Sequence, residues 1–159
     1  MQMQYYADAS YATEPESKSI SGAIFQVGGN AVSWYTRKQS VIAQSTVESE
    51  YISLCTATKQ AYWIAQMLSE ITGKVQLPIT AFQDNQGMIR LASNPIISRR
   101  SKHIKVKFHY VRDKVNAGFI TIDYCPTNDM IADGLTKAII GPKFEELRSS
   151  MGVSNTGKC

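Results

Sequence analysis

Three aspartates stand where segments with the apolar pattern of β-strands end. Asp8 closes the first such segment, Asp84 directly follows the fourth, and Asp133 comes shortly after the fifth. Two glutamates near the start of a long helical segment, Glu48 and Glu50, bring a further carboxylate within reach. Converging carboxylates repel one another and lose hydration, so a cluster of them is stable only when a cation neutralises it. Hard oxygen ligands favour Mg²⁺ or Mn²⁺, and the pattern therefore predicts divalent-metal chemistry.

The two glutamates cannot both belong to such a site. Residues two apart on a helix point about 200° away from each other. The run Ser45-Thr46-Val47-Glu48 matches a capping box, in which the glutamate turns back to the start of the helix. Glu50 instead borders the apolar stripe of the helix through Leu54. We therefore expect Glu50 to be the metal ligand, with Glu48 as the alternative.

Each aspartate also has a structural alternative. Asp84 could cap the helix that follows it, Asp8 could serve turn chemistry, and Asp133 could face the dipole of a short helix. Together, these alternatives require three independent strand ends to carry an aspartate by chance. Because the alternatives need this coincidence and the metal cluster does not, the metal cluster is favoured.

The elements that must position these side chains are strands and helices, which the sequence distinguishes by two different spacings of apolar residues. Strands are expected at Met3 to Ala9, Ser19 to Val27, Ala31 to Thr36, Ile79 to Gln83 and Phe119 to Tyr124. Helices are expected at Ser45 to about Thr72, about Asn85 to before Pro95, about Ser101 to Asn116, Met130 to Lys137 and Gly141 to Met151. Gly28-Gly29-Asn30 predicts a hairpin between the second and third strands. This order predicts an α/β fold with a five-stranded mixed sheet flanked by helices: strands one to three antiparallel, and four and five parallel to the first. We expect the first, fourth and fifth strands to lie together in the middle of the sheet.

The positive charge of the chain is concentrated in one segment. The sequence has 17 basic and 13 acidic residues, a net charge of +4. Seven of the basic residues fall between Arg99 and Lys114, where Asp113 alone opposes them, so the other 10 face 12 acidic residues. A run of one sign is typical of a phosphate-backbone contact, whereas a solvated helix face, the alternative, usually mixes signs. The predicted nucleic-acid contacts in this segment are Arg99, Arg100, Lys102, Lys105 and Lys107.

Length and composition suit one domain with a single core. We expect a domain over residues 1–153 and a flexible tail over 154–159 of the 159 residues. Without a run of about 18 apolar residues or a basic-then-apolar leader, we expect no membrane span and no secretory signal. The three cysteines lie far apart and predict neither zinc nor a disulfide framework, and Cys55 is expected to be a buried thiol in a reducing compartment.

Five short segments carry a family resemblance. They are Tyr6-Ala7-Asp8-Ala9-Ser10, Gln44-Ser45-Thr46-Val47-Glu48-Ser49-Glu50-Tyr51, Asp84-Asn85-Gln86, Ser101-Lys102-His103-Ile104 with His109 and Arg112, and Ile131-Ala132-Asp133-Gly134-Leu135-Thr136-Lys137. Through them, over roughly Tyr5 to Met151, the chain resembles the ribonuclease H domain at the C-terminal end of copia-type retrotransposon polyproteins. The resemblance implies a ribonuclease H fold and hydrolysis of the RNA strand of RNA–DNA hybrids. It also implies a metal-binding tetrad of Asp8, Glu50, Asp84 and Asp133.

The implied chemistry uses two Mg²⁺ ions about 4 Å apart, for which Mn²⁺ can substitute. Asp8 would bridge both ions, Glu50 and Asp84 would complete one site, and Asp133 would complete the other. Four neighbouring side chains could reach 2′-hydroxyls or phosphates of the substrate. They are Ser10, Ser45, Asn85 and Gln86, with helix capping as the alternative for Ser45. The histidine that cellular type 1 enzymes carry before the last aspartate is missing from Tyr124 to Asn128.

The expected partners are an RNA–DNA hybrid and an attached reverse transcriptase domain of the same polyprotein. For an active element, this implies an intracellular location in cytoplasmic virus-like particles. A catalytically silent nucleic-acid-binding module that keeps the fold is the main alternative, and the intact carboxylates argue against it. Strand transfer by an integrase or resolvase of related fold uses a different acidic set.

Overall fold

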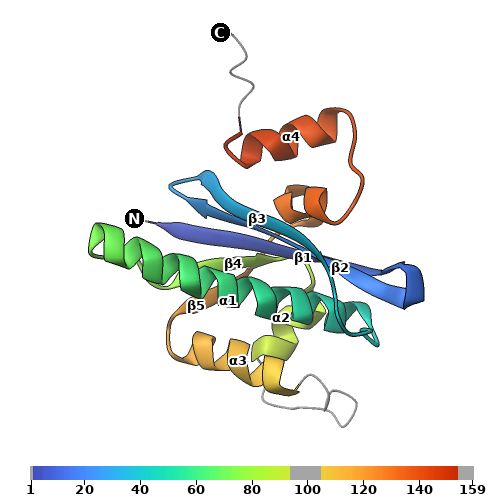
Figure 1. Ribbon diagram of the computed structural model, residues 1–159, viewed down its shortest axis with the longest axis horizontal. Coiled ribbons are helices and arrows are strands. Elements are labelled where there is room, and N and C mark those ends of the chain that lie inside the picture. Colours follow the sequence, from blue (N-terminus) through green and yellow to red (C-terminus); the bar gives the residue numbers. More distant parts are fainter. Residues whose placement is uncertain (1, 94–104, 154–159) are drawn as a thin grey trace.

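The computed structural model describes residues 2–93 and 105–153 and contains one mixed sheet (Figure 1). Its strands are β1 (Met3–Glu14), β2 (Lys18–Val27), β3 (Asn30–Lys38), β4 (Ile79–Gln83) and β5 (Ile120–Tyr124). Their order in the sheet is β3-β2-β1-β4-β5. β1 and β2 pair antiparallel, as do β2 and β3, whereas β4 runs parallel to β1 and to β5. The predicted five-stranded mixed sheet is confirmed.

The expected place of the fifth strand is wrong in one respect. β1, β4 and β5 are neighbours, but β5 forms an edge of the sheet and β1 is the central strand. The hairpin places β2 against one side of β1, so β4 pairs with the other side of β1. β5 pairs with β4 and not with β1, and the fifth strand is therefore the outermost one.

β1 is longer than its apolar pattern predicts. The strand continues past Ala9 to Glu14 because its ladder with β2 runs on from Ser10, opposite Ile20, to Glu14, opposite Lys18, through a register shift. These added residues are mostly exposed, so alternation of apolar residues could not mark them.

The predicted hairpin between β2 and β3 is confirmed, and Gly28 and Gly29 have φ of 60° and 83°, a conformation that glycine adopts without strain.

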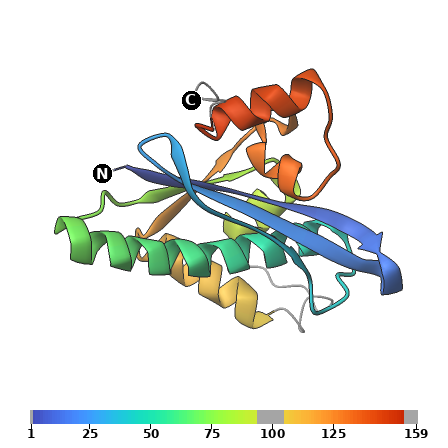
Figure 2. The same ribbon diagram turned by 45° about the horizontal axis from the view of Figure 1, so that its top comes forward.

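Three helices cover one face of the sheet (Figures 1 and 2). They are α1 (Thr46–Thr72), α2 (Gln86–Ser93) and α3 (Lys105–Asn116). The main core lies between this face and α1, where Tyr5 and Phe25 of the sheet pack with Tyr51 and Leu54 of the helix. Cys55 is buried in the same cluster, as predicted. Within the described ranges, no helix combines the length and apolarity that crossing a membrane requires.

The predicted helix boundaries hold closely for α1 and less well elsewhere. Ser45 caps α1, and Gly73 ends it with φ of 79°. α2 begins one residue later than expected, because Asn85 is its cap. The expected start of α3 at Ser101 and the tail at residues 154–159 lie outside the described residues.

The opposite face carries the C-terminal segments (Figure 2). They are η3 (Thr127–Asp129), η4 (Ile131–Leu135) and α4 (Pro142–Ser150). Ile24 of the sheet packs there with Ile131 and Leu147. The helix expected from Met130 to Lys137 is a short 3₁₀ helix, and it packs directly on β2. A Cβ at Gly22 would lie only 2.8 Å from the Leu135 Cβ and the Thr136 Cγ2, so only glycine permits this approach.

Candidate active site

Three of the predicted carboxylates converge at one end of the central strands. Asp8 comes from β1, Glu50 from the first turns of α1, and Asp84 from the residue after β4. One oxygen of each lies within 4.8 Å of the others. Asp8 is 1% exposed and Glu50 4% exposed, whereas Asp84 is half-buried at the rim. The arrangement is therefore a buried acidic cluster that opens to solvent beside Asp84.

Side-chain hydrogen bonds to the backbone of β1 hold the cluster together. The Ser53 hydroxyl of α1 donates to the Asp8 carbonyl oxygen at 2.8 Å. The Gln83 amide nitrogen, at the end of β4, donates to the Ala7 carbonyl oxygen at 2.7 Å. These contacts fix α1 and β4 against β1 at the level of Asp8, so the carboxylates of Glu50 and Asp84 lie close to that of Asp8.

Glu48 and Glu50 have different surroundings. The Glu48 amide donates to the Ser45 hydroxyl at 3.2 Å, and the Glu48 carboxylate accepts from the Gln44 amide at 3.1 Å. Glu48 therefore stabilises the start of α1, as the capping box predicts, but its carboxylate accepts from the amide before the cap rather than from that of Ser45. The Glu50 Oε2 atom is buried and has no hydrogen-bond partner among the described residues. A buried carboxylate oxygen without a partner is costly, and a bound cation would satisfy it.

Asp84 does not cap α2. The Asn85 Oδ1 atom accepts from the Met88 amide at 3.0 Å, which makes Asn85 the cap. The Asp84 carboxylate instead accepts from the Thr127 hydroxyl at 2.9 Å. The capping alternative for Asp84 is therefore wrong, and its carboxylate faces the cluster.

Asp133 lies beside the cluster and is bound by a lysine. It is buried, and its Oδ1 atom lies 2.7 Å from the Lys137 ammonium nitrogen. The same nitrogen lies 3.8 Å from the Asp8 Oδ2 atom, which also accepts a hydrogen bond from the Thr136 hydroxyl. Asp133 thus connects to Asp8 through Lys137, and its place in a metal-binding tetrad remains a prediction.

Burial and mutual repulsion raise the pKa of the two innermost carboxyl groups. Burial is the main cause for Glu50, and the charges of Asp8 and Asp84 add to it, so its pKa rises to about 9. Burial also raises the pKa of Asp8 to about 6, although the Thr136 hydrogen bond and the Lys137 charge oppose the shift. The protein alone therefore compensates the charges of these two carboxylates only in part.

The donor set suits a divalent cation. It consists of carboxylate oxygens, which are hard ligands, and one of its residues, Glu50, has a buried oxygen without a hydrogen-bond partner among the described residues. Mg²⁺ binds through a few carboxylates and keeps several waters, which fits a cluster that opens to solvent at Asp84.

The residues predicted to contact nucleic acid are in several different environments. Ser10 is buried two residues beyond Asp8 on the same strand. Ser45 and Asn85 use their side-chain oxygens as helix caps, which supports the capping alternative for Ser45. Gln86 is exposed at the start of α2.

The basic segment is only partly described. Lys105 is exposed at the start of α3, and Lys107 is half-buried two residues further on. Arg99, Arg100 and Lys102 lie outside the described residues. The nucleic-acid roles of all these side chains remain predictions.

Sequence reasoning missed three residues that hold the carboxylates. Thr127 contacts Asp84, Thr136 contacts Asp8, and Lys137 contacts Asp133. The spacing of four between Asp133 and Lys137 is a signal for an ion pair within a helical turn. The two threonines carry no such signal, because packing of η3 and η4 against the sheet creates their contacts.

Solved structures of low sequence similarity share this architecture. A ribonuclease H1 isolated from compost matches with a TM-score of 0.65 and 15% identity, over 84% of this chain and 91% of that one. The same enzyme in complex with an RNA/DNA hybrid matches with a TM-score of 0.63 and 14% identity, over 84% and 93%. A foamy viral protease-reverse transcriptase in complex with dsDNA matches with a TM-score of 0.59 and 19% identity, over 84% and 90%. The chain has the ribonuclease H fold.

Relatives by sequence come from retrotransposons. The chain is 34% identical over 93% of its length to the Pol polyprotein of transposon TNT 1-94 of Nicotiana tabacum, and 30% identical over 97% to that of transposon RE1 of Arabidopsis thaliana. It is homologous to copia-type retrotransposon Pol polyproteins, as the resemblance of its motifs predicts. It spans about 11% of the length of these relatives. No protein-family model matches the chain.

Proposed function

We propose that this ribonuclease H fold is a metal-dependent endonuclease that hydrolyses the RNA strand of RNA–DNA hybrids during retrotransposon reverse transcription. The observation that carries the proposal is the convergence of Asp8, Glu50 and Asp84 within 4.8 Å, with a buried Glu50 oxygen that lacks a partner. A chain that only bound nucleic acid would gain nothing from burying repelling carboxylates. The hybrid complex of a structural neighbour and the Pol polyprotein relatives support the same substrate.

Asp8, Glu50 and Asp84 would hold one divalent ion, and Asp8 with Asp133 would hold a second. When bound, the two ions would activate a water molecule and stabilise the leaving 3′ oxygen in an in-line displacement. The remaining work falls to residues that orient the ligands. Thr127 fixes the Asp84 carboxylate, and Thr136 fixes that of Asp8.

Substrate binding is proposed to use the charge of α3 and the polar groups around the cluster. Lys105 and Lys107 would contact phosphates, whereas Ser10 and Gln86 would approach sugar hydroxyls near the scissile bond. The chain spans about 11% of its relatives' length, so we place the reverse transcriptase in the remainder of the polyprotein. A foamy viral protease-reverse transcriptase among the structural neighbours supports this arrangement.

The test compares end-labelled RNA–DNA hybrid, duplex DNA and duplex RNA, each with Mg²⁺ and with EDTA. We expect cleavage of the RNA strand of the hybrid in Mg²⁺ alone. Asp8→Asn and Asp84→Asn should abolish it, while Asp123→Asn, at an exposed position on the edge strand β5, should leave it unchanged. An intact hybrid in Mg²⁺ would contradict the proposal and leave the silent binding module as the alternative. Equal rates for Asp84→Asn and the parent would remove the carboxylate cluster from the reaction.

A further inference from the structure

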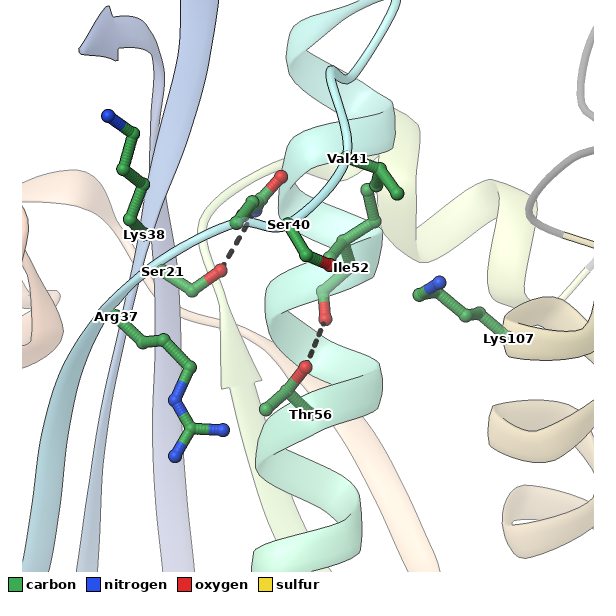
Figure 3. A pocket seen from close by; sticks show the side chains of 9 residues that line it. Ser21, Arg37, Lys38, Ser40, Val41, Ile52, Thr56 and Lys107 are labelled. Carbon is green, nitrogen blue, oxygen red and sulfur yellow. Dashed lines mark hydrogen bonds between the residues drawn. The ribbon is translucent and has the colours of Figure 1, made fainter. Parts of the chain in front are cut away.

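The outward side of α1 differs between the two halves of the helix. Over the first half, a groove of about 280 Å³ between the end of β3 and α3 is lined by three cationic side chains, Arg37, Lys38 and Lys107 (Figure 3). Cations suit phosphates, so this groove belongs with the substrate contacts proposed above. The outward side of the second half is instead apolar, and it has no part in the proposed reaction.

Large apolar side chains are exposed along the second half of α1. Trp63 is 56% exposed, Met67 38% and Ile71 73%. Their spacing of four residues places them in one row along the helix. Leu77, in the segment between α1 and β4, is 52% exposed. We call these four residues the apolar patch.

Two neighbouring hollows connect the members of the apolar patch. One has a volume of about 300 Å³ and is lined by Trp63, Gln66, Met67 and Glu70. The other, of about 180 Å³, has Gln66 and Leu77 in its lining, so Gln66 borders both hollows. Among the described residues that line them, Glu70 alone is charged. Exposed apolar surface with tryptophan and methionine is typical of protein–protein contacts, and a lining without cations does not suit nucleic acid.

Both ends of the described chain lie at the β2–β3 hairpin. The Gly28 amide donates to the Gln2 carbonyl oxygen at 3.0 Å. The Ala31 amide donates to the Met151 carbonyl oxygen at 2.9 Å. A longer polypeptide that continues from either end of the described residues would therefore leave the domain at the hairpin end of the sheet.

The apolar patch lies at this same end of the sheet. β4 runs parallel to β1 with Thr80 opposite Gln4, so Leu77, just before β4, lies beside the start of β1. The start of β1 and the end of α1 lie at one end of the molecule in both views (Figures 1 and 2). The acidic cluster is distant, because Trp63 lies about 20 Å from Glu50 along the helix at a rise of about 1.5 Å per residue.

We propose that the apolar patch docks the reverse transcriptase portion of the polyprotein to which this domain is joined. The inference rests on the proposed function for the identity of this occupant. The chain spans about 11% of the length of its Pol polyprotein relatives, so in them the domain is joined to a much longer chain. A short connection from the hairpin end would hold that chain close to the patch at high effective concentration.

The chemistry of the patch defines the surface that it would bind. The occupant would place apolar side chains against Trp63 and Ile71 and a cationic group opposite Glu70. A partner docked there would leave the mouth of the acidic cluster at Asp84 open to the hybrid. The patch therefore fits a protein that acts on the same nucleic acid from the other end of the domain.

The first experiment follows the two tryptophans of the chain, Trp34 and Trp63, by ¹⁹F NMR after labelling with 5-fluorotryptophan. Trp34 is the matched control, because it is 64% exposed on β3 and lies outside the patch. Segmental ligation joins the labelled domain to the unlabelled reverse transcriptase segment encoded in the same reading frame. Line broadening by a soluble gadolinium chelate measures the exposure of each side chain.

We expect the broadening of the Trp63 signal to fall about fivefold in the joined protein relative to the separate domain, because side chains at the centre of an interface lose nearly all contact with solvent. The broadening of the Trp34 signal should stay the same. Equal broadening of Trp63 in the two proteins would overturn the proposal, as would a reading frame without a reverse transcriptase segment.

Other occupants give different results in the separate domain. Its ¹⁹F spectrum is recorded from low to high protein concentration, and again with RNA–DNA hybrid in Ca²⁺. Shielding of Trp63 that grows with protein concentration would assign the patch to a second copy of the chain. Shielding by the hybrid would assign it to nucleic acid. Either result would overturn the proposal.

The second experiment removes the apolar side chains. The variants are Ile71→Gln, Trp63→Gln and the double variant, with Trp34→Gln as the control. Because these side chains are exposed, the separate domain should keep its unfolding midpoint. In the joined protein, ¹⁵N relaxation with the label confined to this domain should show shared tumbling with the reverse transcriptase in the parent and the control, and independent tumbling in the double variant.

Shared tumbling that persists in the double variant would overturn the proposal, and Ile71→Gln alone serves if Trp63→Gln lowers the unfolding midpoint. Neither experiment needs cleavage. A domain that docks through the patch without cutting the hybrid would contradict only the proposed function, whereas a domain that cuts the hybrid with Trp63 exposed in the joined protein would contradict only the docking surface.

Discussion

The Lys137 ammonium lies 2.7 Å from the carboxylate of Asp133, one helical turn earlier, and the protein thereby compensates the charge of Asp133. No cation of the described residues lies as close to Glu50, whose Oε2 atom is unpartnered. The two sides of the candidate site therefore differ before any metal binds. The side formed by Asp8, Glu50 and Asp84 is open to a metal ion, whereas on the other side the Lys137 ammonium already pairs with Asp133.

Replacing Lys137 with glutamine should destabilise the metal-free protein and increase the stabilisation that Mg²⁺ provides. The Lys137 side chain is 44% exposed, so solvent screening limits the loss to about 0.5–1 kcal/mol. Thermal unfolding in EDTA and in Mg²⁺ measures both quantities. Lys18→Gln, which removes a surface ion pair with Glu16, is the control and should not change the response to Mg²⁺. An unchanged Mg²⁺ response in Lys137→Gln would show that the ion pair does not oppose metal binding.

Stability of the metal-free protein should fall as pH rises from about 5 to 9. Burial, with the charges of Asp8 and Asp84, raises the Glu50 pKa from 4.5 to about 9, and burial raises that of Asp8 from 3.8 to about 6. Between the unfolded and folded pKa values the folded protein holds a proton that the unfolded chain releases, so the free energy of unfolding decreases with pH. The upper bound is about 1.4 kcal/mol per pH unit for each proton.

Urea unfolding in EDTA at pH 5, 7 and 9 checks this dependence. Saturating Mg²⁺ should flatten it, because the bound ion keeps the carboxylates ionised in the folded state. Glu50→Gln should remove the decrease above pH 6, whereas Glu70→Gln, at an exposed position near the end of the same helix, should not. Stability that rises with pH in EDTA would contradict the repulsion within the cluster.

The sequence predicts the parts of the site that depend on local periodicity. Asp8 and Asp84 stand out because apolar strand patterns end beside them, and helical geometry favours Glu50 over Glu48. The contacts of Thr127 and Thr136 could not be predicted, because they depend on how 3₁₀ segments pack against the sheet.

Ser45 caps α1, and this role can be separated from contact with substrate. Ser45→Ala should lower the free energy of unfolding by about 1 kcal/mol, and Ser45→Asp should restore it because aspartate is an equally good cap. The added negative charge should still weaken hybrid binding several-fold, since Ser45 stands beside the proposed path of the phosphates. Chemical unfolding and anisotropy measure the two effects. Hybrid affinity equal to that of the parent in Ser45→Asp would assign Ser45 to capping alone.

Gly22 permits the contact between η4 and Asp8, so a single methyl group there should disturb the site without changing any carboxylate. A Cβ at this position would lie 2.8 Å from the Leu135 Cβ and the Thr136 Cγ2, so η4 must move away from β2. We expect Gly22→Ala to cost about 1–3 kcal/mol of stability, in the range typical of overpacking, and to weaken Mg²⁺ binding. Calorimetric Mg²⁺ titration at a temperature where the variant stays folded measures the second effect. Thr136→Val removes the hydroxyl bond to Asp8 without the steric displacement, and it should weaken Mg²⁺ binding less than Gly22→Ala does. If both variants bind Mg²⁺ as the parent does, the position of η4 has no influence on the carboxylate cluster.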